Sequence, residues 1–183
     1  LRTGEMFGVP IALVILVLVF GAVVTALVPL GLAGISIIVA LGMAALLGQV
    51  FQLSFFVTNM ITMIGLAVGI DYSLFVVARY REERASGRDK AEAIARAGAT
   101  AGRAVFFSGV TVVLALLGLL LVRSNIMMSL GVGASFVVVA SVLASMTLLP
   151  AILSLVGDRV NMLSIPWFGR TRAGYEETRP SGF

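Results

Sequence analysis

The sequence predicts an all-α integral membrane protein. Of its 183 residues, 60% are hydrophobic and only 12% are charged, and the mean hydropathy is +1.10. A soluble domain carries about 25% charged residues. Five segments are long and apolar enough to cross a bilayer as helices, and none alternates apolar and polar residues as a barrel strand would. We therefore expect a bundle of five transmembrane helices.

Short connections join the five predicted spans, except for one long charged loop. The spans cover about Phe7–Val28, Leu32–Gly48, Leu53–Ala78, Ala104–Val122 and Met127–Val156. Pro29 and Gly31 predict the break between the first and second spans, because both residue types disfavour a continuing helix. We expect residues 1–160 to form one transmembrane domain, and residues 161–183 to form a polar, flexible tail.

The basic residues predict how the chain is oriented in the membrane. Seven lie in the long loop at 79–103 and four follow Val156, which makes 11 of the 13 Lys and Arg residues. Five spans place that loop and the tail on the same side, and the positive-inside rule makes that side cytoplasmic. The N-terminus and the connections at 49–52 and 123–126 are then expected outside.

The long loop predicts a short amphipathic cytoplasmic helix that leads into the fourth span. Asp89 can cap this helix, and Glu92 stands three residues later, which is capping-box spacing. A weakly apolar face follows at Ala93, Ile94, Ala97 and Ala101. The alternative of a solvated charged loop stays open, because Gly98 and Gly102 disfavour a helix.

Asp71 is the one acidic residue inside a predicted span. A charged carboxylate at mid-bilayer costs about 2.5–3.5 kcal/mol on insertion scales. Either a protein partner or protonation relieves that cost, so an aspartate placed there can exchange a proton. The alternative is that Asp71 is drawn toward Arg79 at the membrane surface. Eight residues of helix span roughly 12 Å, which is too far for simple direct pairing.

The residues around Asp71 strengthen its functional interpretation. Gly65 and Gly69 form a GxxxG pattern, which predicts a close contact with another helix. Tyr72 supplies a phenol that can donate to a carboxylate or relay a proton. On a helix, Tyr72 points about 100° away from Asp71. We therefore expect the two side chains to serve one interface without bonding to each other.

Three further polar residues are possible supporting members of the site. Asn59 lies in the third span, and Ser108 and Thr111 lie one turn apart in the fourth, where they could meet it. Ordinary bonding of each hydroxyl to the backbone carbonyl four residues earlier is the simpler alternative.

Soluble-enzyme chemistry is not expected, because the sequence has no phosphate-binding loop with lysine and no nucleophile–base set. With no histidine and no cysteine, it also lacks the usual metal ligands. We expect no enzyme activity, no metal and no cofactor. The basic residues flank the spans, so they do not predict a nucleic-acid partner.

The stretch TNMITMIGLAVGIDYSLFVVARYREE resembles the fourth transmembrane helix of the MMPL family, within the resistance-nodulation-division superfamily. VILVLVFGAVVTALVPL, AGATAGRAVFFSGVTVVLALLGLLL and SMTLLPAILSLVGDRV match the same family in order, so the resemblance covers roughly residues 4–160. It implies a proton-driven exporter of lipids or other hydrophobic molecules in the bacterial cytoplasmic membrane. It also implies that Asp71 and Tyr72 form half of a proton relay between two similar six-helix halves.

Against that family pattern the sequence lacks the first helix, the porter domain and the second half. We therefore expect it to be part of a longer protein, whose second half or another copy completes the relay. Membrane lipids and a hydrophobic or lipid substrate are the other expected partners. The alternative is a truncated, non-transporting membrane scaffold or lipid-binding module without a complete relay.

Overall fold

The computed structural model of the chain describes residues 10–11, 14 and 23–156. Most of the first predicted span, residues 7–28, lies outside this part of the chain, and so does the predicted tail at 161–183. Every long element that the structure describes is a helix.

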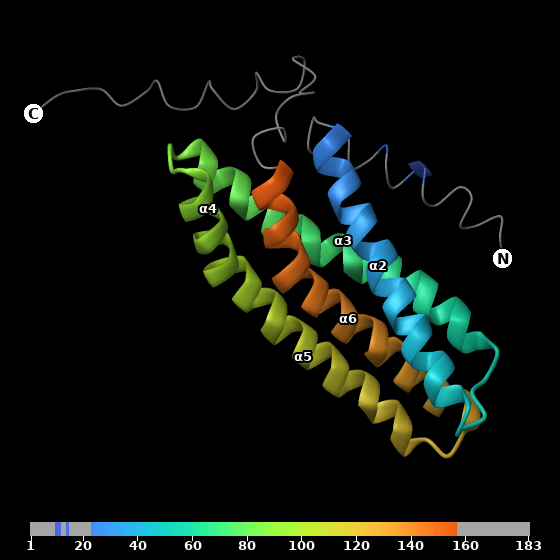
Figure 1. Ribbon diagram of the computed structural model, residues 1–183. Helices are drawn as coiled ribbons and strands as arrows, with labels where there is room; N and C mark the ends of the chain where they lie inside the picture. The colour runs from blue at the N-terminus through green and yellow to red at the C-terminus, as the bar shows by residue number, and fades with distance from the viewer. Residues whose placement is uncertain (1–9, 12–13, 15–22, 157–183) are drawn as a thin grey trace, which may run out of the picture. The chain divides into compact units, whose positions relative to one another are not determined.

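Residues 28–157 form one compact unit of the chain. Within this unit, successive long helices run in alternating directions (Figure 1). The elements are α2 Val23–Gly48, α3 Phe56–Ala85, α4 Lys90–Ala97, the π-turn η1 Gly98–Gly102, α5 Arg103–Leu117, the 3-10 turn η2 Gly118–Leu121, and α6 Asn125–Val156.

Helix α6 is the central element, packed against both α3 and α5. Half of its most apolar stretch is buried, compared with 11% for the helix that contains α4 and α5. Within the described ranges, four helices are long and apolar enough to cross a membrane. Much of their outer surface consists of exposed leucine, valine and phenylalanine side chains. This apolar surface is compatible with the hydrocarbon layer of a bilayer.

The predicted break at Pro29 and Gly31 is wrong, because α2 continues through both residues. Proline removes one backbone donor from a helix. A break inside hydrocarbon would leave more backbone groups without partners, so membrane helices commonly continue through proline. The Pro29 side chain is fully buried. Residues 23–28 of the first predicted span therefore belong to α2, and the described part of the chain contains four helices long enough to cross a membrane rather than five.

Helix α3 extends seven residues beyond its predicted end at Ala78. The charged residues that suggested an end instead support the helix. Arg79 pairs with Glu82 at 2.8 Å and with Glu83 at 2.6 Å, three and four residues later. The helix stops before Gly87, whose φ of 81° lies in the left-handed region that suits glycine.

The short helix predicted to follow Asp89 is confirmed as α4. The Asp89 side chain caps it by accepting a 2.6 Å hydrogen bond from the Glu92 N–H. Its predicted apolar face packs inward, with Ala93, Ala97 and Ala101 buried. The chain then passes through the π-turn at Gly98–Gly102 directly into α5, so the charged loop is largely helical.

The two short connections, after α2 and before α6, lie at the end of the bundle opposite α4 (Figure 1). There the Ser54 N–H donates a 3.0 Å hydrogen bond to Ser129 Oγ. This bond ties the start of α3 to the start of α6. The bundle thus has one end that is rich in charge and one end with short connections.

Candidate functional site on α3

Asp71, Tyr72 and Ser73 follow one another on α3 and point in three directions, because each helical residue is turned by about 100° from the last. Asp71 is exposed, Tyr72 is half-buried and Ser73 is fully buried. The Ser73 hydroxyl donates to the Gly69 carbonyl at 2.6 Å. Of the three residues, only Asp71 is exposed.

The Asp71 carboxylate has no hydrogen bond or ion pair with any residue that the structure describes. The alternative that Arg79 holds it does not agree with the structure. The Arg79 guanidinium contacts Glu82 Oε2 at 2.8 Å and Glu83 Oε1 at 2.6 Å. Asp71 is therefore available to a partner outside the described helices.

Tyr72 reaches toward α5, away from Asp71. Its hydroxyl lies 3.8 Å from the position that a side-chain carbon at Gly109 would occupy. That carbon would also overlap the Val142 side chain of α6. At Gly109, the backbone of α5 therefore lies close to side chains from both α3 and α6. The described part of the chain contains no hydrogen bond between Asp71 and Tyr72.

Gly65 and Gly69 lie where α3 meets α2 and α6. A methyl group at Gly65 would lie 2.5 Å from Ile37 Cγ1 and 2.6 Å from Val137 Cγ2. At Gly69 it would lie 2.8 Å from the Ala33 Cα. Because Ala33 presents its backbone there, no rotamer change could make room. These small residues let the helix backbones approach closely, as membrane helix contacts require.

The structure does not bring together the three supporting polar residues. Asn59 lies near Val57 and Ile61, which pack at Gly133 of α6, whereas Ser108 adjoins Gly109, which packs at Val142. Positions 133 and 142 are nine residues apart on α6, which corresponds to roughly 14 Å of helix.

The surroundings of the three supporting residues do not indicate a shared functional site. Asn59 is half-buried, and Ser108 and Thr111 are exposed. The Thr111 hydroxyl donates to the Phe107 carbonyl at 2.9 Å, which is the simpler alternative that the sequence left open. No group of three or more potential metal-ligating His, Cys, Asp or Glu side chains occurs in the described ranges.

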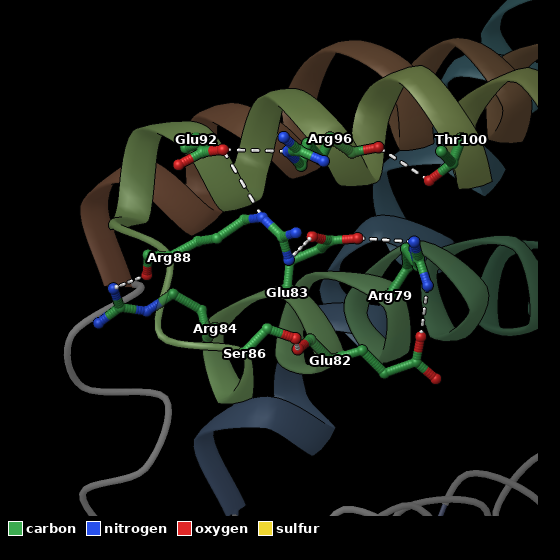
Figure 2. Close-up of polar contacts among 9 residues, drawn as sticks. All are labelled: Arg79, Glu82, Glu83, Arg84, Ser86, Arg88, Glu92, Arg96 and Thr100. Atoms are coloured by element: carbon green, nitrogen blue, oxygen red, sulfur yellow. Dashed lines mark hydrogen bonds and ion pairs between the residues drawn. The ribbon is translucent and has the colours of Figure 1, made fainter.

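A charged cluster that the sequence did not single out joins α3 to α4 (Figure 2). Glu83 is only 4% exposed. Its Oε1 contacts Arg79 Nη2 and its Oε2 contacts Arg88 Nη1, both at 2.6 Å. Arg88 Nε also lies 3.6 Å from Glu92 Oε1. We call Arg79, Glu83, Arg88 and Glu92 the α3–α4 cluster.

Only part of the α3–α4 cluster has a local sequence signal. Arg79 and Glu83 stand four residues apart on one helix, a spacing that allows pairing. The contact of Glu83 with Arg88 crosses the turn at Gly87. It depends on the chain reversing direction there, which residue spacing alone does not reveal.

Comparison with known proteins identifies the family. The model of the MMPL family matches residues 1–178. The chain is 41% identical to the mycolic acid-containing lipids exporter MmpL11 of Mycolicibacterium smegmatis over 175 residues, which is 94% of this chain and 18% of that protein.

Two proteins of Mycobacterium tuberculosis are also similar. The trehalose monomycolate exporter MmpL3 is 38% identical over 164 residues, covering 90% of this chain and 17% of that protein. The heme uptake protein MmpL11 is 39% identical over 154 residues, covering 84% of this chain and 16% of that protein. The chain thus spans less than a fifth of the length of each of these relatives. It belongs to the MMPL family of membrane transporters, which are not enzymes.

Proposed function

We propose that this chain is the transmembrane core of one half of a proton-driven exporter of lipids or other hydrophobic molecules. Asp71 carries the proton in this proposal, and Tyr72 assists it. A group in another part of the transporter, or in a second copy of it, provides the partner for Asp71. The observation that carries the proposal is a carboxylate within an apolar span that faces outward and has no partner among the described residues.

Physical chemistry supports the role of Asp71. The apolar part of α3 runs from Phe56 to Ala78, so Asp71 stands about 12 Å from the first basic residue, Arg79. At that depth in the hydrocarbon layer, an unpaired carboxylate is unfavourable, whereas the protonated, neutral acid is tolerated. A change in proton occupancy would therefore alter how strongly α3 is held against its partner. Such coupling of charge to helix position is what a proton-driven transporter requires.

The names of the relatives support the substrate class. Two are exporters of mycolic-acid-containing lipids or trehalose monomycolate, and a third is a heme uptake protein. These molecules share large apolar parts. We therefore propose a hydrophobic or lipid substrate whose identity is set by parts of the transporter beyond residues 1–183.

The charge distribution supports the orientation in the membrane. Seven of the 13 basic residues lie in 79–103, at the end of the bundle that carries α4. We propose that this end is cytoplasmic and that the short connections at 49–52 and 123–126 are outside. Asp71 then lies in the inner half of the membrane, nearer the cytoplasmic surface.

The test is transport by the complete protein in proteoliposomes under an imposed pH gradient. Trehalose monomycolate is a suitable first probe, because one relative is named for exporting it. Asp71→Asn should reduce gradient-driven efflux to the level measured without a gradient, because asparagine resembles a protonated aspartate but cannot release a proton. Tyr72→Phe should have a smaller effect, since it removes one hydrogen bond worth about 0.5–1.5 kcal/mol.

Asp89→Asn is a matched control for the same chemical change. Asparagine caps helices about as well as aspartate, so α4 should remain folded and efflux unchanged. Normal gradient-driven efflux by the Asp71→Asn protein would contradict the proton-relay assignment. A wild-type protein that binds lipid but shows no gradient-driven efflux would instead support the scaffold or lipid-binding alternative.

A further inference from the structure

Arg103, the first residue of α5, differs from the other arginines whose partners the structure shows. Arg79, Arg88 and Arg96 each pair with at least one glutamate. No carboxylate in the described ranges pairs with Arg103, although it is exposed. Its guanidinium carbon lies 5.7 Å from the centroid of the Phe107 ring. That distance is suitable for a cation–π contact, which holds the charge in place without neutralising it.

Exposed apolar side chains form a stripe that begins one turn after Arg103, follows α5 and ends in the η2 turn. Its members recur at alternating intervals of four and three residues, so they lie on one face of the helix. They are Phe107 at 56% exposure, Val110 at 42%, Leu114 at 66%, Leu117 at 42% and Leu121 at 88%. The stripe contains no glycine or alanine, unlike the contact at Gly65 and Gly69, where helices approach closely. Large aliphatic side chains of this kind suit lipid chains better than a tightly packed helix.

The position of Arg103 along the helix matches the boundary of the hydrocarbon. Nineteen residues without charge separate Arg103 from Arg123. At helical rise they span roughly 28 Å, close to the hydrocarbon thickness of about 30 Å. Arg103 therefore lies at the level of the lipid headgroups when the stripe spans the apolar layer. An arginine at that level can bind phosphate oxygens in bidentate fashion.

We propose that Arg103, oriented by Phe107, binds the phosphate of an anionic phospholipid whose acyl chains lie along the α5 stripe. Charge complementarity favours this occupant, since an unpaired cation stands at one end of an otherwise apolar surface. The site is separate from Asp71 and does not depend on the proton-relay proposal. It would keep α5 against a bound lipid at the end of the bundle that carries α4.

The proposal can be tested with the complete transporter reconstituted in bilayers that contain a photoactivatable lipid. Diazirine-bearing phosphatidylglycerol and phosphatidylcholine are compared in separate samples, and mass spectrometry measures the crosslink yield on the peptide containing Phe106 and Phe107. The wild-type protein should prefer phosphatidylglycerol. Arg103→Gln should lower that preference about fivefold, the factor expected for loss of one basic contact at an anionic surface.

Arg96→Gln is the matched control. Arg96 is also an exposed arginine at this end of the bundle, but it already pairs with Glu92 at 3.1 Å. Its substitution should leave the preference unchanged. An unchanged preference for phosphatidylglycerol in the Arg103→Gln protein would overturn the proposal. An equal loss of that preference in both variants would also overturn it, because it would indicate general attraction of anionic lipid to the positive charge at this end of the bundle. A peptide that gives no lipid crosslinks in the wild-type transporter would show that protein covers the stripe, and would also overturn it.

Discussion

Neutralising Glu83 is the sharpest test of how α3 is attached to α4. Removing one partner from a fully buried ion pair costs about 3–5 kcal/mol. The penalty should be smaller here because Arg79 and Arg88 are 41% and 31% exposed, so water screens them. Each also keeps another glutamate, Glu82 at 2.8 Å and Glu92 at 3.6 Å. We expect Glu83→Gln to weaken the attachment by about 1–3 kcal/mol.

A free-energy change of that size should raise the population of the locally opened turn about 5- to 150-fold. Limited trypsin digestion of the purified transporter measures the population of the opened turn. Arg84 is exposed and lies next to the turn, so trypsin can cleave after it when the turn opens. The rate of cleavage after Arg84 should rise by a factor in that range, while cleavage elsewhere stays unchanged. The rates are read from peptide yields over time by mass spectrometry.

Glu82→Gln provides a control one residue away. The Glu82 side chain is 66% exposed and, among the described residues, forms an ion pair with Arg79 alone, so its contribution should be about 0–1 kcal/mol. Cleavage in this variant should stay within about fivefold of the wild type. If Glu83→Gln changes the rate by less than about twofold, or if both variants change it equally, the burial of Glu83 does not secure the turn.

Two further predictions concern packing and orientation. Gly69→Ala should lower the free energy of unfolding by about 1–3 kcal/mol, because the methyl group would meet the Ala33 backbone at 2.8 Å. Gly42→Ala, with nothing within 4 Å, should be neutral or stabilising; equal thermal shifts in detergent would contradict this. In a cysteine-free background, Ser86→Cys should resist a membrane-impermeant maleimide in intact cells, and Gln52→Cys should react. Labelling of Ser86→Cys before permeabilisation would contradict the proposed orientation.

The four apolar spans in the described part of the chain could be predicted from the sequence, because length and composition determine what can cross a bilayer. The start of α4 could be predicted because capping is a local interaction, and the Asp89 cap is confirmed. The errors arose where a local rule competed with the surroundings. Pro29 disfavours a helix in isolation, but its effect is outweighed when other backbone groups have no water to bind. The charges after Ala78 suggested an end, yet their pairing prolongs α3.

In the candidate site, too, local sequence features could be predicted, whereas contacts between distant segments could not. Asp71 could be found from the sequence because a single acid in an apolar run is unusual whatever surrounds it. The contact of Glu83 with Arg88 could not, because it forms across a chain reversal. The position of the Tyr72 hydroxyl near Gly109 depends on how α3 and α5 are placed in the bundle, and helical spacing specifies only the direction in which the Tyr72 side chain leaves α3.

Helix α3 carries both Asp71 and Glu83, which stand twelve positions apart and are therefore joined by about 18 Å of continuous helix. A displacement of α3 that follows a charge change at Asp71 must therefore also move Glu83. The buried contacts of Glu83 resist separation, so α4 should follow α3. Beyond α4, the π-turn contains Gly98 and Gly102, where an added methyl group would meet nothing within 4 Å. Since packing does not require glycine there, we expect this turn to absorb the movement between α4 and α5. Unchanged gradient-driven efflux by the Glu83→Gln protein, despite a loosened turn, would show that α4 takes no part in transport.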